Sequence, residues 1–357
     1  MQSAGKAYLS QLTGIRFFAA YLVICHHFLV IAPNRFANPI LSAVGDVAVS
    51  LFFVLSGFVL TLSNRSAQGK MIKGRADYLV ARAARLYPQY LFAFLLVAPF
   101  VIFDTFAKHP SAQEALPRLL LNAAAYLSML QSWVPWLANA WIGPAWSLST
   151  EAFFYISFLW LVPPPPAKLA QWIALAASAA ILPVMLGHAA VAEPAHAFWY
   201  FFPPFRLGEF MLGMGIAQVF RSGLFPDRLK TASGAIFVLA MTLLAAAMIY
   251  LGPVWIRIAS TVLLPVALLN LAVSRGIVAR FLGSRAMVVL GDASYGLYLI
   301  QLPMFGIYCK LVGRTYLPGL HFLGYSIFAV AVSVAVHFCL EKPAAKAIKQ
   351  HWRARQN

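Results

Sequence analysis

Apolar residues fill this chain in long runs that short polar loops separate. A helix needs about 20 apolar residues to cross the hydrocarbon core of a bilayer, and ten runs approach or reach that length. They cover residues 12–31, 44–62, 86–104, 146–162, 169–187, 205–220, 232–251, 256–273, 287–309 and 319–340. The pattern predicts an all-α integral membrane protein with about ten transmembrane helices. Glu341-Lys342-Pro343 is expected to end the last helix.

The stretch 119–141 breaks this pattern. It is apolar and carries Trp133, Trp136 and Trp141, but Pro135 interrupts it and Pro144 follows it. Tryptophan is common at membrane interfaces, and proline breaks a helix interior. We therefore predict an interfacial or re-entrant segment. If the stretch spans the membrane instead, the topology changes.

Composition supports the membrane class. The chain is 62% hydrophobic and 10% charged, whereas soluble domains carry about 25% charged residues. A net charge of +17 would suggest nucleic acid in a soluble protein. Here the charges lie in short loops between apolar runs, so no nucleic-acid partner is expected. The three cysteines lie in apolar segments, and the Cys and His residues show no metal-ligand spacing. No metal is therefore expected.

The basic residues predict an orientation. With the N-terminus inside, 19 of the 27 Lys and Arg residues fall in inner segments and six in outer segments, while Arg16 and Arg206 lie within helices. This excess predicts N-in and C-in. No cleavage site clearly follows the first run, so that helix is expected to be retained. The longest loop, about 105–145, is too short for a soluble extracytoplasmic domain. We expect one membrane-embedded domain over 1–357.

The first apolar run, LTGIRFFAAYLVICHHF, holds Arg16 near its start and His26 and His27 near its end. Ten residues separate Arg16 from His27, which is roughly 16 Å along a helix. Polar groups at membrane depth are costly and often functional, and histidine suits proton transfer near neutral pH. Adjacent residues point about 100° apart, so only one histidine can face a given cavity. A hydrogen bond to a neighbouring helix is the simpler role.

Two further polar sites each have two interpretations, ligand binding and a purely structural role. Ser56-Gly57 interrupts an apolar helix, either as a small-residue packing face or for close approach to a ligand. Arg82 and Arg85 lie three apart on one helix face, next to a basic loop. Topology alone explains such charges, but arginine also pairs bidentately with phosphate. A cytosolic ligand that bears phosphate would suit this cluster, which includes Arg65, Lys70, Lys73 and Arg75.

Two carboxylates lie in apolar surroundings. Glu151 follows Trp146 in WSLSTEAFFY, where it must be protonated or find a partner. Topology predicts that Glu151 lies at a depth similar to that of His27. Arg206 and Glu209 are three residues apart, so an ion pair is the simplest expectation, again near the depth of His27.

Seven blocks together resemble the membrane-bound acyltransferase-3 family. They fall in order between about residues 11 and 343: TGIRFFAAYLVICHHF, SLFFVLSGF, ARAARLYPQY, PAWSLSTEAFFY, FRLGEFMLG, GDASYGLYLIQLP and CLEKP. Each block is weak alone, whereas the ordered set is specific. Two positions depart from the family pattern: Ser50 stands where many relatives have Asp, and Gln301 where many have His.

The resemblance implies a ten-helix enzyme of the bacterial cytoplasmic membrane. Such enzymes transfer an acyl group, commonly acetyl, from acyl-CoA to hydroxyls of extracytoplasmic sugars. The family's motifs fall on Arg16 and His27, on Ser56 and Gly57, on Arg82 and Arg85, and on Glu151. The resemblance thereby selects His27 over His26.

We therefore expect His27 as general base with Glu151 as its partner. Acetyl-CoA is the expected donor, bound by Arg16, Ser56, Gly57, Arg82 and Arg85. A carbohydrate or lipid-linked glycan acceptor is expected at Arg206, Glu209 and Trp146, with a macrolide or other small molecule as the alternative acceptor. A covalent acyl-histidine intermediate is the competing chemistry. A proton-coupled transporter or flippase is the competing function, because buried His, Glu and Arg also suit transport.

Overall fold

The computed structural model describes residues 9–31, 39–66, 68–189, 195–223, 227–313 and 319–356. Lys6, Arg35 and Arg314, which the topology prediction used, lie outside these ranges. Within the described ranges the chain is helical and has no strand, apart from an isolated antiparallel bridge between Arg65 and Met71. The predicted all-α class is thus confirmed.

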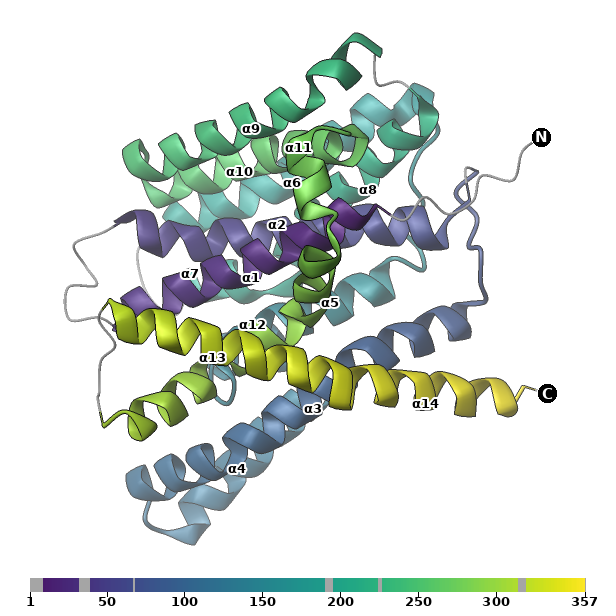
Figure 1. Cartoon of the computed structure of the whole chain (residues 1–357). Helices are drawn as coiled ribbons and strands as arrows, with labels where there is room; N and C mark the ends of the chain where they lie inside the picture. Colours follow the sequence, from purple (N-terminus) through teal and green to yellow (C-terminus); the bar gives the residue numbers. More distant parts are fainter. Residues whose placement is uncertain are drawn as a thin grey trace. The chain divides into compact units, whose positions relative to one another are not determined.

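Figure 1 shows the α-helices, coloured and labelled in chain order. They are α1 Ser10–Ile31, α2 Pro39–Asn64, α3 Arg75–Lys108, α4 Ala112–Leu127, α5 Trp146–Ser157, α6 Leu169–Ala189, α7 Ala195–Phe201, α8 Leu207–Ser222, α9 Asp227–Tyr250, α10 Pro253–Val273, α11 Ile277–Leu282, α12 Arg285–Leu311, α13 Leu320–Val336 and α14 Lys342–Ala354.

Seven helical segments of the described residues are long and apolar enough to cross a membrane. They lie in α2, α3, α6, α9, α10, α12 and the continuous stretch of α13 and α14. Of the other three predicted spans, 12–31 forms α1, while 146–162 and 205–220 form only the 12-residue α5 and the 16-residue α8. The chain is a multi-pass membrane protein; the number of ten spans and the N-in, C-in orientation stay predictions.

Packing divides the chain into two compact units. Unit 1 comprises Met1–Gly74, Leu161–Met185 and Arg206–Tyr295. Its centre is α2, which packs against α1, α8 and α10, while α9 packs on α10. An α-helix that is apolar all round is expected in the interior, and most of the apolar part of α2 is buried. Gly223, in the left-handed region at φ 67°, follows the end of α8.

Unit 2 comprises Arg75–Trp160, Leu186–Phe205 and Gly296–Asn357. Its longest helix, α3, contains Pro88 and Pro99 and packs against α4, α5 and α14. Residues 128–145 form short helical turns held by hydrogen bonds, such as that from Tyr126 Oη to the carbonyl of Ala138 at 2.8 Å. As the sequence predicted, the stretch 119–141 is therefore interrupted and does not form one continuous helix. The single-domain organisation of the whole chain stays a prediction.

The end of the last apolar helix differs from expectation. Glu341-Lys342-Pro343 does not end it, because a π-helical turn at His337–Glu341 leads directly into α14. Pro343 lies in the first turn of α14, directly after this π-helical turn. The side chain of Trp352 then donates from Nε1 to Oδ1 of Asp77 at 2.8 Å, and Gln356 donates to the same oxygen at 3.1 Å. These bonds fasten the end of α14 to the start of α3.

Candidate active site

Helix α1 of unit 1 carries both Arg16 and His27, as the sequence predicted. Both side chains are partly buried, and 11 helical steps separate them, about 16 Å along the axis. The ring of His26 meets that of His27 edge to face at 5.2 Å between centroids. His26 also lies against α2, since a β-carbon on Gly45 would come within 2.7 Å of its ring. His26 thus packs against α2, while the choice of His27 over His26 as the base stays a prediction.

Gly57 lies where α2 and α8 approach each other backbone to backbone. A β-carbon there would overlap the carbonyl oxygen of Phe210, and one on Gly213 would overlap that of Val54. Because no side chain fits at either position, helix packing is enough to explain both glycines. Ser56 beside it is partly buried. Donor binding by Ser56 and Gly57 stays a prediction.

Replacing Gly57 by alanine should push α2 and α8 apart. Overpacking of this kind costs typically about 1–3 kcal/mol, so the midpoint of thermal unfolding in detergent micelles should fall. Gly306→Ala is the matched control, because a β-carbon there would meet no atom within 4 Å. Equal midpoints for the two variants would show that the approach of α2 to α8 does not depend on Gly57.

Arg206 and Glu209 form the ion pair that their spacing predicted. Arg206 Nε lies 3.0 Å from Glu209 Oε2, and the two residues are 1% and 7% exposed. Ser50 of α2 completes the cluster: its hydroxyl donates to Glu209 Oε1 at 2.7 Å and accepts from Arg206 Nη2 at 3.3 Å. The guanidinium also lies over the ring of Phe53, 5.2 Å from its centroid. Sequence reasoning named Ser50 only as a departure and missed this role.

In unit 2, Arg82 lies between two tyrosines. Its guanidinium carbon is 6.0 Å from the centroid of Tyr78 and 5.9 Å from that of Tyr155. The hydroxyl of Tyr155 in turn donates a hydrogen bond to Oε1 of Glu151, one turn earlier on α5, at 2.6 Å. Arg82, Tyr155 and Glu151 therefore form one connected cluster.

The start of α5 is fixed by hydrogen bonds within the same unit. Tyr298 of α12 donates to the carbonyl of Pro144 at 3.0 Å and shares a hydrogen bond with Ser147 at 2.8 Å. Trp146 is 6% exposed and packs against the rings of Tyr200 and Phe201. These contacts set the position of Glu151 one turn further along.

One arginine of the basic loop after α2 is buried and serves the fold. Arg65 is 3% exposed and donates to the carbonyls of Gly69 and Leu161 at 2.9 and 2.8 Å. Arg221 of α8 caps the end of α2 by donating to the carbonyls of Thr61, Leu62, Arg65 and Ser66. Arg65 is thus committed to the fold, while Lys70, Lys73 and Arg75 are exposed.

The predicted residues therefore fall into two sets. Unit 1 holds Arg16, His27, Ser56, Gly57, Arg206 and Glu209; unit 2 holds Arg82, Arg85, Trp146 and Glu151. The structure joins Arg206 to Glu209 directly and links Arg82 to Glu151 through Tyr155. The pairing of His27 with Glu151 stays a prediction. Tyr155 was missed, although its spacing of four residues from Glu151 signals a contact on one helix face.

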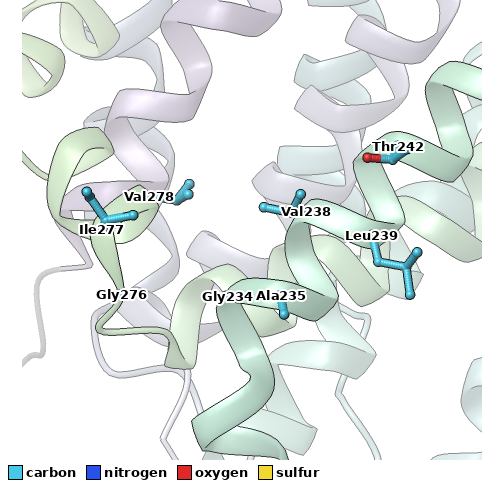
Figure 2. Close-up of a pocket in the computed structure, with 8 residues that line it drawn as sticks. All are labelled: Gly234, Ala235, Val238, Leu239, Thr242, Gly276, Ile277 and Val278. Atoms are coloured by element: carbon cyan, nitrogen blue, oxygen red, sulfur yellow. The ribbon is translucent and has the colours of Figure 1, made fainter.

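A separate apolar pocket of about 570 Å³ lies in unit 1 between α9 and the start of α11 (Figure 2). Its lining is Gly234, Ala235, Val238, Leu239, Thr242, Gly276, Ile277 and Val278. The pocket offers no charged group, so it does not suit a phosphate or a proton-transfer step. Among the described residues, no cluster of three or more His, Cys, Asp or Glu could hold a metal ion.

Comparison with known proteins gives the class of this helical membrane protein. A family model described as "Acyltransferase domain", that of the acyltransferase-3 family, matches residues 9–338. The chain is 31% identical over 332 residues to Acyltransferase MdmB of Streptomyces mycarofaciens, covering 85% of this chain and 81% of that protein. It is 26% identical over 330 residues to the "Putative peptidoglycan O-acetyltransferase YrhL" of Bacillus subtilis, covering 83% of this chain and 48% of YrhL.

A third relative, "Protein 2 in picA locus" of Rhizobium radiobacter, is 34% identical over 151 residues, which cover 39% of this chain and 75% of that protein. No solved structure matches. The family match covers most of the chain, and it defines a membrane enzyme that transfers acyl groups. The chain belongs to the acyltransferase-3 family. The transporter alternative finds no support among these relatives.

Proposed function

We propose that this protein is an acyl-CoA-dependent O-acyltransferase of the bacterial cytoplasmic membrane. It moves an acyl group, most simply acetyl, from cytosolic acyl-CoA to a hydroxyl of a surface or exported carbohydrate or a lipid-linked glycan. The observation that most supports the proposal is the spacing on α1, where Arg16 and His27 lie about 16 Å apart along the helix axis. This spacing matches the pantetheine arm that separates the phosphates of CoA from its sulfur. The named relatives support acyl transfer, and one is named as a putative O-acetyltransferase.

The donor's phosphates pair with Arg82 and Arg85, with Arg16 adding a third guanidinium. Arginine suits this role because its planar fork binds phosphate through two hydrogen bonds. Arg82 is already oriented by the rings of Tyr78 and Tyr155. Ser56, which is partly buried beside Gly57, contacts the arm.

His27 acts as general base in the transfer step. It removes the proton of the acceptor hydroxyl, whose oxygen attacks the thioester carbonyl. The carbon–sulfur bond breaks, and the CoA thiolate takes the proton from His27 and leaves as the free thiol. Glu151 orients the imidazole or shares its charge, and Tyr155 holds the carboxylate by its hydrogen bond. Arg206, Glu209 and Trp146 bind the acceptor.

The direct test measures CoA thiol release by the purified full-length protein in lipid nanodiscs. Acetyl-CoA should yield free thiol at a rate that rises on addition of glycan acceptor. Mass spectrometry of surface glycans from cells with and without the gene should show acetyl groups only in the former. Transport without thiol release would contradict the proposal and favour a proton-coupled transporter or flippase.

Replacing Arg82 and Arg85 together by alanine should raise KM for acetyl-CoA by about 10-fold or more and leave kcat nearly unchanged. The reason is that phosphate contacts are made equally in the ground state and the transition state. S-acetyl-pantetheine, which lacks the nucleotide phosphates, should show the same KM with both proteins. Lys168→Ala, an exposed basic residue near the start of α6, is the control. A fall in kcat with KM unchanged would contradict the phosphate role.

A further inference from the structure

Gln89 of α3 is a buried amide without a partner in the described part of the chain. The residue is 1% exposed, and neither its Oε1 nor its Nε2 has a hydrogen-bond partner there. Burying an amide without hydrogen bonds is unfavourable, whereas a leucine of similar size would avoid that cost. A polar group from outside the chain that reaches Gln89 would remove this penalty.

The position of Gln89 relates it to the proposed donor site. It follows Arg82 by seven residues on the same helix, which returns it to the same face about 10 Å further along the axis. Proline has no N–H, so the carbonyl of Ala84 does not receive the helical hydrogen bond that another residue at position 88 would donate. This turn of α3 therefore has a carbonyl that can accept a hydrogen bond from a ligand. Gly296 of α12 lies directly against the amide: a β-carbon there would come within 3.0 Å of Gln89 Nε2. A side chain at 296 would crowd the head group of Gln89.

The chemistry of a primary amide then defines the ligand. It offers both a donor and an acceptor, which are the groups that a secondary amide needs. The pantetheine arm of acyl-CoA carries two secondary amides between its phosphates and its sulfur. A donor whose phosphates pair with Arg82 would extend these amides along α3 toward Gln89. We propose that Gln89 binds an amide of the pantetheine arm; this rests on the proposed function, in which the donor is acyl-CoA.

The test uses three acetyl donors with the full-length protein in nanodiscs. Acetyl-CoA carries phosphates and amides, S-acetyl-pantetheine carries amides alone, and S-acetyl-2-mercaptoethanol carries neither. For Gln89→Leu we expect KM to rise about 10-fold for the first two donors, because one lost hydrogen bond is worth about a factor of ten. KM for the third donor should stay unchanged, and kcat should stay within about twofold. Arg82→Ala should raise KM for acetyl-CoA alone.

Two controls separate binding from folding. Gln89→Met keeps the length of the side chain and should reproduce the pattern if Leu packs poorly. Asn270→Leu removes another buried amide, on α10 in unit 1, whose Nδ2 donates within its own helix to the carbonyl of Val266 at 2.8 Å. It should leave every KM unchanged. Unchanged KM values for Gln89→Leu and Gln89→Met in active enzyme would overturn the assignment. Absence of wild-type turnover with acetyl-CoA would instead overturn the proposed function itself.

Discussion

Replacing His27 by alanine should lower the rate of acyl transfer by at least about 100-fold, the usual contribution of a general base. Binding of CoA should persist, because Arg16 lies about 16 Å away along α1 and Arg82 and Arg85 are untouched. The measurement pairs steady-state turnover with the dissociation constant for CoA. Near-normal turnover of His27→Ala would exclude this mechanism.

His26→Ala is the matched control for this prediction. Its imidazole is adjacent in sequence but packs against α2 at Gly45. The variant should lose some stability and keep turnover within a few-fold in the folded fraction. A reversed result, with activity lost only in His26→Ala, would transfer the role of base to His26. A stoichiometric burst of free CoA before acceptor is added, absent in His27→Ala, would indicate an acyl-histidine intermediate.

Removing one partner of the Arg206–Glu209 pair should have the largest effect on stability. Both residues are buried, so Arg206→Leu leaves the carboxylate without its counter-charge, and Glu209→Leu leaves the guanidinium without one. Loss of one member of a buried ion pair costs about 3–5 kcal/mol. The midpoint of thermal unfolding in nanodiscs should therefore fall sharply for each single variant.

The double variant separates the structural role of the pair from acceptor binding. Arg206→Leu with Glu209→Leu buries no charge, so most of the lost stability should return. If the pair also binds the acceptor, as we propose, KM for the glycan should remain raised while KM for acetyl-CoA is normal. An unchanged KM for the glycan would limit the pair to stability. A double variant as unstable as the single ones would contradict the electrostatic explanation.

The sequence predicted those features that depend on local spacing. Apolar runs of sufficient length identify the helical membrane class, since hydropathy is read over neighbouring residues. The structure likewise keeps Arg16 and His27 on one helix and pairs Arg206 with Glu209. Both features were predictable because each spans only a few helical turns.

Features that depend on distant parts of the chain were missed. Ser50 and Glu209 are 159 positions apart, and no local pattern joins them. Arg65 donates a hydrogen bond to the carbonyl of Leu161, which is 96 positions away, so neighbouring residues do not reveal its structural role. The last helix continues beyond Glu341 because a π-helical turn accommodates the Lys-Pro step, which local proline rules read as an end. Ser50 and Arg65 thus owe their roles to tertiary contacts that no local pattern signals.

The bond between Trp352 and Asp77 has a consequence for biosynthesis. These residues are 275 positions apart, so the contact cannot form until Trp352 has been synthesised and has left the ribosome. Asp77 lies in the first turn of α3, five residues before Arg82. The start of α3 therefore gains this hydrogen bond only after α14 has been synthesised. A chain that ends before Trp352 lacks this hydrogen bond, so its α3 should be less firmly held at the start, close to Arg82.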